Sequence, residues 1–110
     1  MKVSDIVEQS GWRVLAGAGS LGSEVSGGYV ADLLSCVMAG AEAGDLWVTL
    51  QTHANIVAVA SLLGISAIVV AEGANVPEGT VEKAEEQGMP LLSSPDPVYE
   101  SVARLIALGV

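Results

Sequence analysis

The chain has 110 residues, of which 51% are apolar and 15% are charged, and its formal charge at pH 7 is −9. This length fits one domain with one core, and the apolar content excludes a disordered chain. Thirteen acidic residues against four basic ones exclude a basic stripe that follows a nucleic-acid backbone. We therefore expect no nucleic-acid partner.

Cysteine content and apolar runs indicate the compartment. The single cysteine, Cys36, excludes an internal disulfide and fits the reducing cytoplasm, and residues 1–10 lack the apolar region of a signal peptide. The most apolar stretch, residues 56–71, is shorter than the ~20 residues of a spanning helix, and Gly64 interrupts it. We expect no membrane segment. The surplus of apolar residues on so small a domain instead favours a homodimer.

The first third of the chain predicts one short helix and two extended segments. Ser4 is positioned to cap a helix over residues 5–9, which Gly11 ends. Residues 12–16 alternate between apolar and polar and predict a strand, and residues 24–31 predict a second extended segment. We expect these two segments to pair as a hairpin-like unit.

The remainder of the chain alternates between strands and helices. Asp32 is positioned to cap a short helix over residues 33–38. The elements predicted after it are strands at 45–50, 66–71 and 89–93 and helices at 54–63, 78–87 and 96–108. Such alternation is typical of a parallel sheet with right-handed crossovers. The sequence thus predicts a single compact α/β domain over residues 1–110. Its sheet is expected to be mostly parallel and flanked by helices, with the hairpin-like unit at the N-terminus.

The predicted helix at 54–63 is apolar nearly all round, with only Asn55 and Ser61 interrupting it. A helix of this kind is buried on two sides. We expect one side to cover the sheet and the other to meet a second subunit.

Residues 17–22 match the pattern GxGxxG and follow a predicted strand. In dinucleotide-binding proteins these glycines let the backbone approach a pyrophosphate at the start of a helix. Residues 23–28 have no helical period, so the pattern is interpreted as a glycine-rich turn.

Complete catalytic motifs are absent from the sequence. There is no P-loop and no GxSxG, and one histidine with one cysteine cannot complete a tetrahedral zinc site. The carboxylate pair Glu85-Glu86 is expected on a solvated helix. We expect no catalytic residue, no metal and no cofactor, with an uncharacterised hydrolase or transferase as the remaining enzymatic alternative.

Polar residues gather where predicted parallel strands end, and ligands of open α/β sheets bind beyond these carboxyl ends. Thr52 is positioned to cap the following helix, and free N–H groups there suit an anion. His53 can donate a hydrogen bond or titrate near neutrality. A cap beside an exposed histidine is the alternative. The candidate binding residues at the strand ends are Thr49, Gln51, Thr52, His53, Asn55, Glu72, Gly73, Ser93 and Ser94.

Three segments, at residues 24–30, 32–35 and 44–60, resemble the DRTGG domain family, and the resemblance covers nearly the whole chain. The signature Asp-Arg-Thr-Gly-Gly has its counterpart in Ser26-Gly27-Gly28, with Ser23 and Glu24 near the charged positions. The resemblance therefore adds Gly27 and Gly28 to the candidate binding residues. The N-terminal domain of HPr kinase is similar. This chain has nothing like that kinase's P-loop domain, so kinase activity is not implied.

The resemblance implies a compact α/β domain with a regulatory role, frequently dimeric. Related domains occur fused to CBS-domain pyrophosphatases and phosphotransacetylases, and some stand-alone members are encoded near iron-only hydrogenase subunits. The resemblance therefore implies a protein partner in redox or acetate metabolism. We expect a non-catalytic regulatory or interaction module that forms a homodimer. The alternative is a sensor that binds a nucleotide or phosphorylated metabolite at the strand ends.

Overall fold

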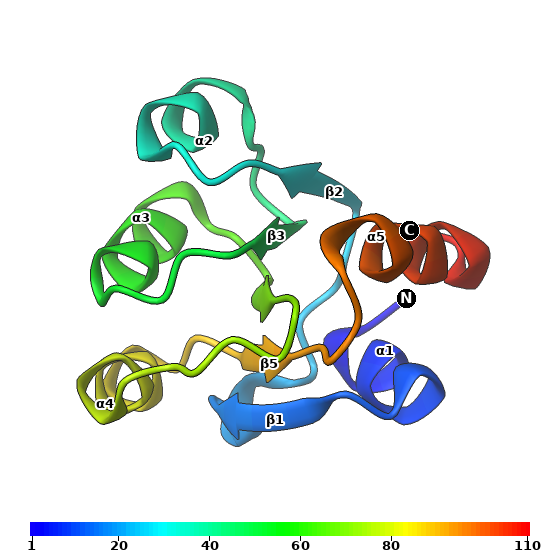
Figure 1. Cartoon of the computed structure of the whole chain (residues 1–110), viewed down its shortest axis with the longest axis horizontal. Coiled ribbons are helices and arrows are strands. Elements are labelled where there is room, and N and C mark those ends of the chain that lie inside the picture. The colour runs from blue at the N-terminus through cyan, green and yellow to red at the C-terminus, as the bar shows by residue number, and fades with distance from the viewer.

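The computed structural model describes residues 1–110 as a five-stranded sheet between two layers of helices (Figure 1). The helices are α1 (Val3–Ser10), α2 (Leu34–Gly40), α3 (Asn55–Leu63), α4 (Glu78–Gln87) and α5 (Val98–Leu108). The strands are β1 (Arg13–Ala16), β2 (Gly27–Val30), β3 (Asp45–Thr49), β4 (Ala67–Val70) and β5 (Leu91–Ser93). The expected compact α/β domain with a mostly parallel sheet is confirmed.

The strand order in the sheet is β1-β5-β4-β3-β2. Strands β2 to β5 pair in parallel, and β1 runs antiparallel to β5. The predicted hairpin-like unit is therefore wrong, since β1 and β2 form opposite edges of the sheet. The connection over residues 17–26 is longer than a hairpin loop of about two to five residues, so it does not force the two strands together.

The helices divide between the two faces of the sheet. Helices α2, α3 and α4, which connect successive parallel strands, cover one face, and α1 and α5 cover the other (Figure 1). All three crossovers lie on the same face, as a constant crossover handedness requires. Helix α3 buries Ile56, Val57 and Ala60 but leaves Leu62 73% exposed. The side of α3 that we expected to contact a second subunit is thus exposed to solvent in the single chain.

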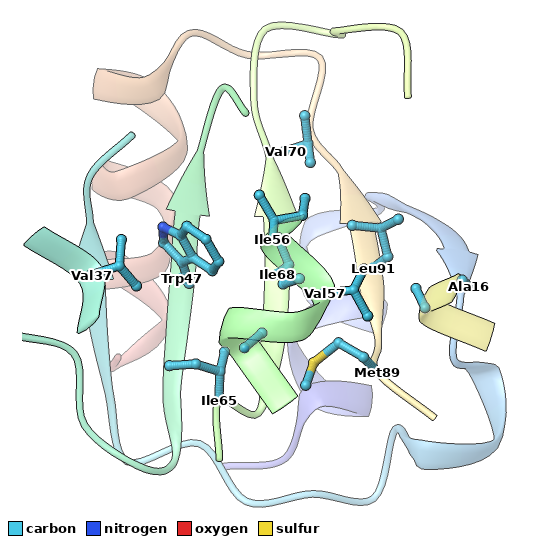
Figure 2. Packing of buried hydrophobic residues seen from close by; sticks show 12 residues of the cluster. Ala16, Val37, Trp47, Ile56, Val57, Ile65, Ile68, Val70, Met89 and Leu91 are labelled. Atoms are coloured by element: carbon cyan, nitrogen blue, oxygen red, sulfur yellow. The ribbon is translucent and has the colours of Figure 1, made fainter. Parts of the chain in front are cut away.

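Two apolar clusters hold the layers together. Figure 2 shows the first, in which Trp47, Ile68 and Leu91 from three neighbouring strands pack with Ile56 and Val57 of α3. The second lies on the opposite face and is formed by α1, α5 and the alternate strand positions. Its members are Val3, Ile6, Trp12, Leu46, Val48, Ala67, Val69, Ala71, Leu92 and Leu105. Burial on both faces explains the nearly continuous apolar sequence of the central strands.

The predicted caps of α1 and α2 are wrong. Helix α1 begins after Lys2, whose backbone N–H donates to the Asp5 carboxylate at 2.8 Å, so Ser4 lies inside the helix. Helix α2 begins after Leu33. The Asp32 carboxylate instead accepts the Thr49 hydroxyl at 2.9 Å and the Leu50 N–H at 2.8 Å. Asp32 therefore joins the ends of β2 and β3.

The glycine-rich segment at 17–22 forms a short 3-10 turn, and no α-helix follows it. Gly17 has φ 76°, and a Cβ at this position would lie 2.5 Å from the backbone of Met89 and Pro90. Its N–H donates to the Glu85 carboxylate at 2.8 Å. Glu85 therefore holds the turn against α4, beyond the solvated role expected for it.

Candidate functional site

The order of strands and helices places one crevice at the carboxyl edge of the sheet. Helix α4, which follows β4, lies on one face, whereas α5, which follows β5, lies on the other. The loops that follow these two adjacent parallel strands therefore turn toward opposite faces of the sheet. Open α/β sheets bind ligands at such a switch point, because the diverging loops leave a crevice between them.

A cavity of about 380 Å³ lies at this switch point. The β4–α4 loop contributes Gly73 and Asn75, and the end of β5 contributes Ser93. Strand β1 contributes Arg13, which pairs with Ser93 in the sheet. The volume is within the range of about 300–1,000 Å³ typical of small-molecule pockets.

The two loops beside the cavity are tied together by backbone hydrogen bonds. The N–H groups of Glu72 and Gly73 donate to the carbonyls of Asp96 and Ser94 at 2.8 and 2.9 Å. Glu72 is the only residue other than glycine with a positive φ, at 62°. Such a conformation is unfavourable for a side chain with a Cβ and persists only where the surroundings hold it. The crevice is therefore already shaped in the single chain.

Ser94 lies behind this wall and is fully buried. Its Oγ is 2.8 Å from the Ser101 Oγ and accepts the Asp96 N–H at 3.2 Å. Among the candidates at these strand ends, Gly73 and Ser93 line the cavity, whereas the hydrogen bonds of Ser94 fasten α5 to the loop before it.

The end of β3 forms a separate, shallow hollow lined by Asp32, Leu50, Gln51 and Thr52. Helices α2 and α3 lie on the same face, so no switch point occurs here. The polar groups are already engaged, because Asp32 accepts from Thr49 and Leu50, and the Gln51 amide donates to the Asp32 carbonyl at 3.0 Å. The Asp32 carboxylate also makes this hollow unfavourable for an anion.

The N-cap residue of α3 is Ala54, and the side chain that accepts an N–H at the start of this helix belongs to His53 rather than Thr52. The His53 Nδ1 accepts the Asn55 N–H at 3.0 Å, which satisfies one of the free N–H groups at the helix start. The Thr52 carbonyl accepts the Thr80 hydroxyl at 2.7 Å and thereby connects this loop to α4. The expected Thr52 cap is wrong, and the backbone N–H of Asn55 is already satisfied by His53.

Gly27 and Gly28 lie at the other end of the sheet. They pair with Asp45 and Leu46, which begin β3, whereas the remaining candidates follow strand ends. A Cβ at Gly27 would lie 2.9 Å from the Asp45 carboxylate. The structure therefore does not bring these glycines together with the other candidate binding residues.

Sequence reasoning missed Arg13 and Asn75, which line the switch-point cavity. Asn75 follows a predicted strand end, so its position in the loop was a usable signal. Arg13 gave no such signal, because its place depends on the pairing of β1 with β5, a strand far along the chain.

No group of three or more metal-binding side chains of His, Cys, Asp or Glu comes together in the chain. None of its helices combines the length and the apolar character needed to cross a membrane.

The comparisons with known proteins agree with this architecture. No family model matches the sequence, and no curated protein matches it. The chain is similar to the crystal structure of the CBS and DRTGG domains of the regulatory region of Clostridium perfringens pyrophosphatase, complexed with the activator diadenosine tetraphosphate. The TM-score is 0.75 at 14% sequence identity, over 96% of this chain.

The class that this similarity defines is an α/β domain with the fold found in a regulatory region. More particularly, the chain shares its fold with a region that contains CBS and DRTGG domains, which agrees with the DRTGG resemblance of the sequence segments. The chain spans 46% of the length of that structure, and the likeness is one of fold.

Proposed function

We propose that the protein is a non-catalytic regulatory module that acts as a homodimer and contacts a protein partner. The observation that carries this proposal is an apolar face formed by β2 and α5, which we call the β2–α5 face. Its residues are Val30, Val98, Tyr99, Val102, Ala103 and Ile106.

The β2–α5 face is uncovered in the single chain. Tyr99 is 86% exposed, Ile106 65% and Val30 47%, and they line one hollow with only apolar neighbours. Contiguous exposed apolar surface of this kind marks interaction sites. In a chain of charge −9, a face without charged residues is where two copies approach with the least repulsion.

The edge of β2 supports a second copy as the occupant of this face. Strand β2 pairs with β3 on one side only, so the backbone groups on its outer side lack sheet partners. Antiparallel pairing of β2 with β2 of a second copy would join the two sheets across a two-fold axis. The same axis would bring the two α5 helices together and bury Tyr99 and Ile106.

The regulatory part of the proposal is supported by the fold. The similar structure is a regulatory region of an enzyme rather than its catalytic part. A protein partner in redox or acetate metabolism remains the proposal that the sequence resemblance implies.

Sedimentation equilibrium tests the dimer with two matched substitutions. Ile106→Glu places a charge on the β2–α5 face and is expected to give monomers at micromolar concentration, where the unchanged chain is dimeric. Leu62→Glu places the same charge at a similarly exposed leucine of α3 and is expected to leave the dimer intact. A monomeric unchanged chain would refute the dimer, and dissociation by Leu62→Glu alone would move the interface to α3.

A second candidate function is ligand sensing at the carboxyl edge of the sheet, which the switch-point cavity favours. The similar structure contains the activator diadenosine tetraphosphate, and a phosphate-containing metabolite is the corresponding proposal for this chain. A ligand at 100 times its Kd stabilises the folded state by about 2.7 kcal/mol. Thermal unfolding with AMP, ATP and diadenosine tetraphosphate tests this, and an unchanged melting temperature with all three would oppose it.

A further inference from the structure

We infer that the switch-point cavity binds a small molecule that carries one oxyanion group, a carboxylate or a phosphate monoester, beside an apolar body. This inference rests on the ligand-sensing function and names the ligand class and the residues that would select it. Arg13, Asn75 and Ser93 would hold the oxyanion, and Leu15, Val76 and Val81 would contact the apolar body.

The charge lining the cavity is opposite in sign to that of the whole chain. Arg13 is one of only four basic residues, against thirteen acidic ones, and no carboxylate lines the cavity. A guanidinium presents a planar fork of N–H donors that matches the two oxygens of a carboxylate or phosphate. The cavity is thus an electrostatically favourable place for an anion on an otherwise anionic protein.

The polar side chains of the cavity are free to bind. Arg13 takes part in neither of the chain's two ion pairs. Arg13, Asn75 and Ser93 make no side-chain hydrogen bond within the chain, unlike Asp32 and Gln51 in the hollow at the end of β3. A ligand would therefore gain these hydrogen bonds without breaking protein ones.

The apolar lining of the cavity indicates that the remainder of the ligand is apolar. Leu15, Val76 and Val81 line the cavity and pack at the rim of the cluster shared by α3 and α4. Small-molecule sites combine such apolar surface with a few convergent polar groups. One guanidinium on a chain of charge −9 matches a single oxyanion and disfavours a polyphosphate.

The walls of the cavity are held in place before a ligand arrives. The bonds from Glu72 and Gly73 to the carbonyls of Asp96 and Ser94 join its two loops, and Arg13 is fixed opposite Ser93 by the β1–β5 register. A preformed site avoids the entropy cost of ordering its loops on binding.

The test is a titration followed by two-dimensional ¹H–¹⁵N NMR, with phenyl phosphate, benzoate and benzyl alcohol as probes. Phenyl phosphate and benzoate carry the two oxyanions on the same ring, and benzyl alcohol is the uncharged control. We expect at least one anionic probe to shift the amide resonances of Gly73, Asn75 and Ser93 at millimolar concentration. Tighter binding of one anion than the other identifies which oxyanion the site prefers.

Substitutions make the test specific. Arg13→Gln is expected to weaken binding of the anionic probe about tenfold or more, as loss of a charge-assisted pair predicts. Lys83→Gln removes an exposed positive charge from α4, outside the cavity lining, and is expected to leave binding unchanged.

Four outcomes would overturn the inference. Equal binding of benzyl alcohol, or unchanged binding by Arg13→Gln, would refute the selection of an oxyanion while leaving a ligand site in place. Shifts confined to residues 50–53 would place the anion at the end of β3 instead. If neither these probes nor the three nucleotides bind, the ligand-sensing function itself fails.

Discussion

The two tryptophans differ in hydrogen bonding, so substitutions at both positions measure how much one buried hydrogen bond contributes to the free energy of unfolding. Both side chains are almost fully buried, with exposed fractions of 0% for Trp47 and 4% for Trp12. The Trp47 Nε1–H donates to the Ala31 carbonyl at 2.9 Å. The Trp12 Nε1 is the only buried side-chain nitrogen or oxygen without a partner. Replacing each by phenylalanine removes the same atoms but has opposite effects on hydrogen bonding.

The magnitude follows from these contacts. Trp47→Phe loses a hydrogen bond and leaves the partly buried Ala31 carbonyl without its donor, at a cost of about 1–3 kcal/mol. Trp12→Phe removes a donor whose burial without a partner already costs about 1–3 kcal/mol. The loss of packed volume is shared, so it largely cancels in the comparison. The two effects add, so we expect Trp47→Phe to lower the free energy of unfolding by about 2–6 kcal/mol more than Trp12→Phe does.

Urea unfolding followed by far-ultraviolet circular dichroism measures this difference, because the signal does not depend on the tryptophan that is removed. The free energies are obtained by linear extrapolation, with an unchanged m-value as the check that the two states are comparable. Equal losses for the two variants, or a larger loss for Trp12→Phe, would refute the hydrogen-bond assignment.

Two further predictions concern turns and caps. Gly17→Ala is expected to destabilise the fold by about 2–3 kcal/mol or more, because its Cβ would collide with the Met89 backbone at a positive φ. Gly19→Ala, which meets nothing within 4 Å, should change stability by no more than about 0.5 kcal/mol in the same urea assay. His53→Ala should cost about 1 kcal/mol by removing the acceptor for the Asn55 N–H, whereas His53→Asn keeps an acceptor and should cost less. Equal losses for the two His53 variants would show that this cap does not stabilise α3.

The local pattern of the sequence was sufficient for most of the elements. Helix α4 has the predicted bounds, and Gly11, Gly64 and Gly88 end helices with a positive φ as expected from glycine at these positions. The apolar run at β4 correctly indicated a strand buried on both faces. Periodicity and helix-end signals are local, so one sequence can carry them.

The long-range arrangement required the structure. The edge position of β1 depends on its pairing with β5, which no neighbouring residue specifies. The candidate residues at the ends of β3, β4 and β5 were predicted as one edge. In the structure these residues belong to two separate places, the crevice with Gly73 and Ser93 and the hollow beside Thr52. The crevice forms because α4 and α5 lie on opposite faces of the sheet. Asp32 was wrongly predicted as a helix cap. Its actual partner, the Thr49 hydroxyl, belongs to another strand and could not be inferred from the residues next to Asp32.

The pairing of β1 with β5 also has a consequence for how the chain folds. Arg13 pairs with Ser93, eighty positions later, so the first strand has no sheet partner until nearly the whole chain is available. Contacts of such high sequence separation pay their loop-closure entropy late and slow folding. The parallel strands β2 to β5, joined in order by single helices, are expected to assemble first. Docking of β1 would then be the final step, completing the crevice around Arg13.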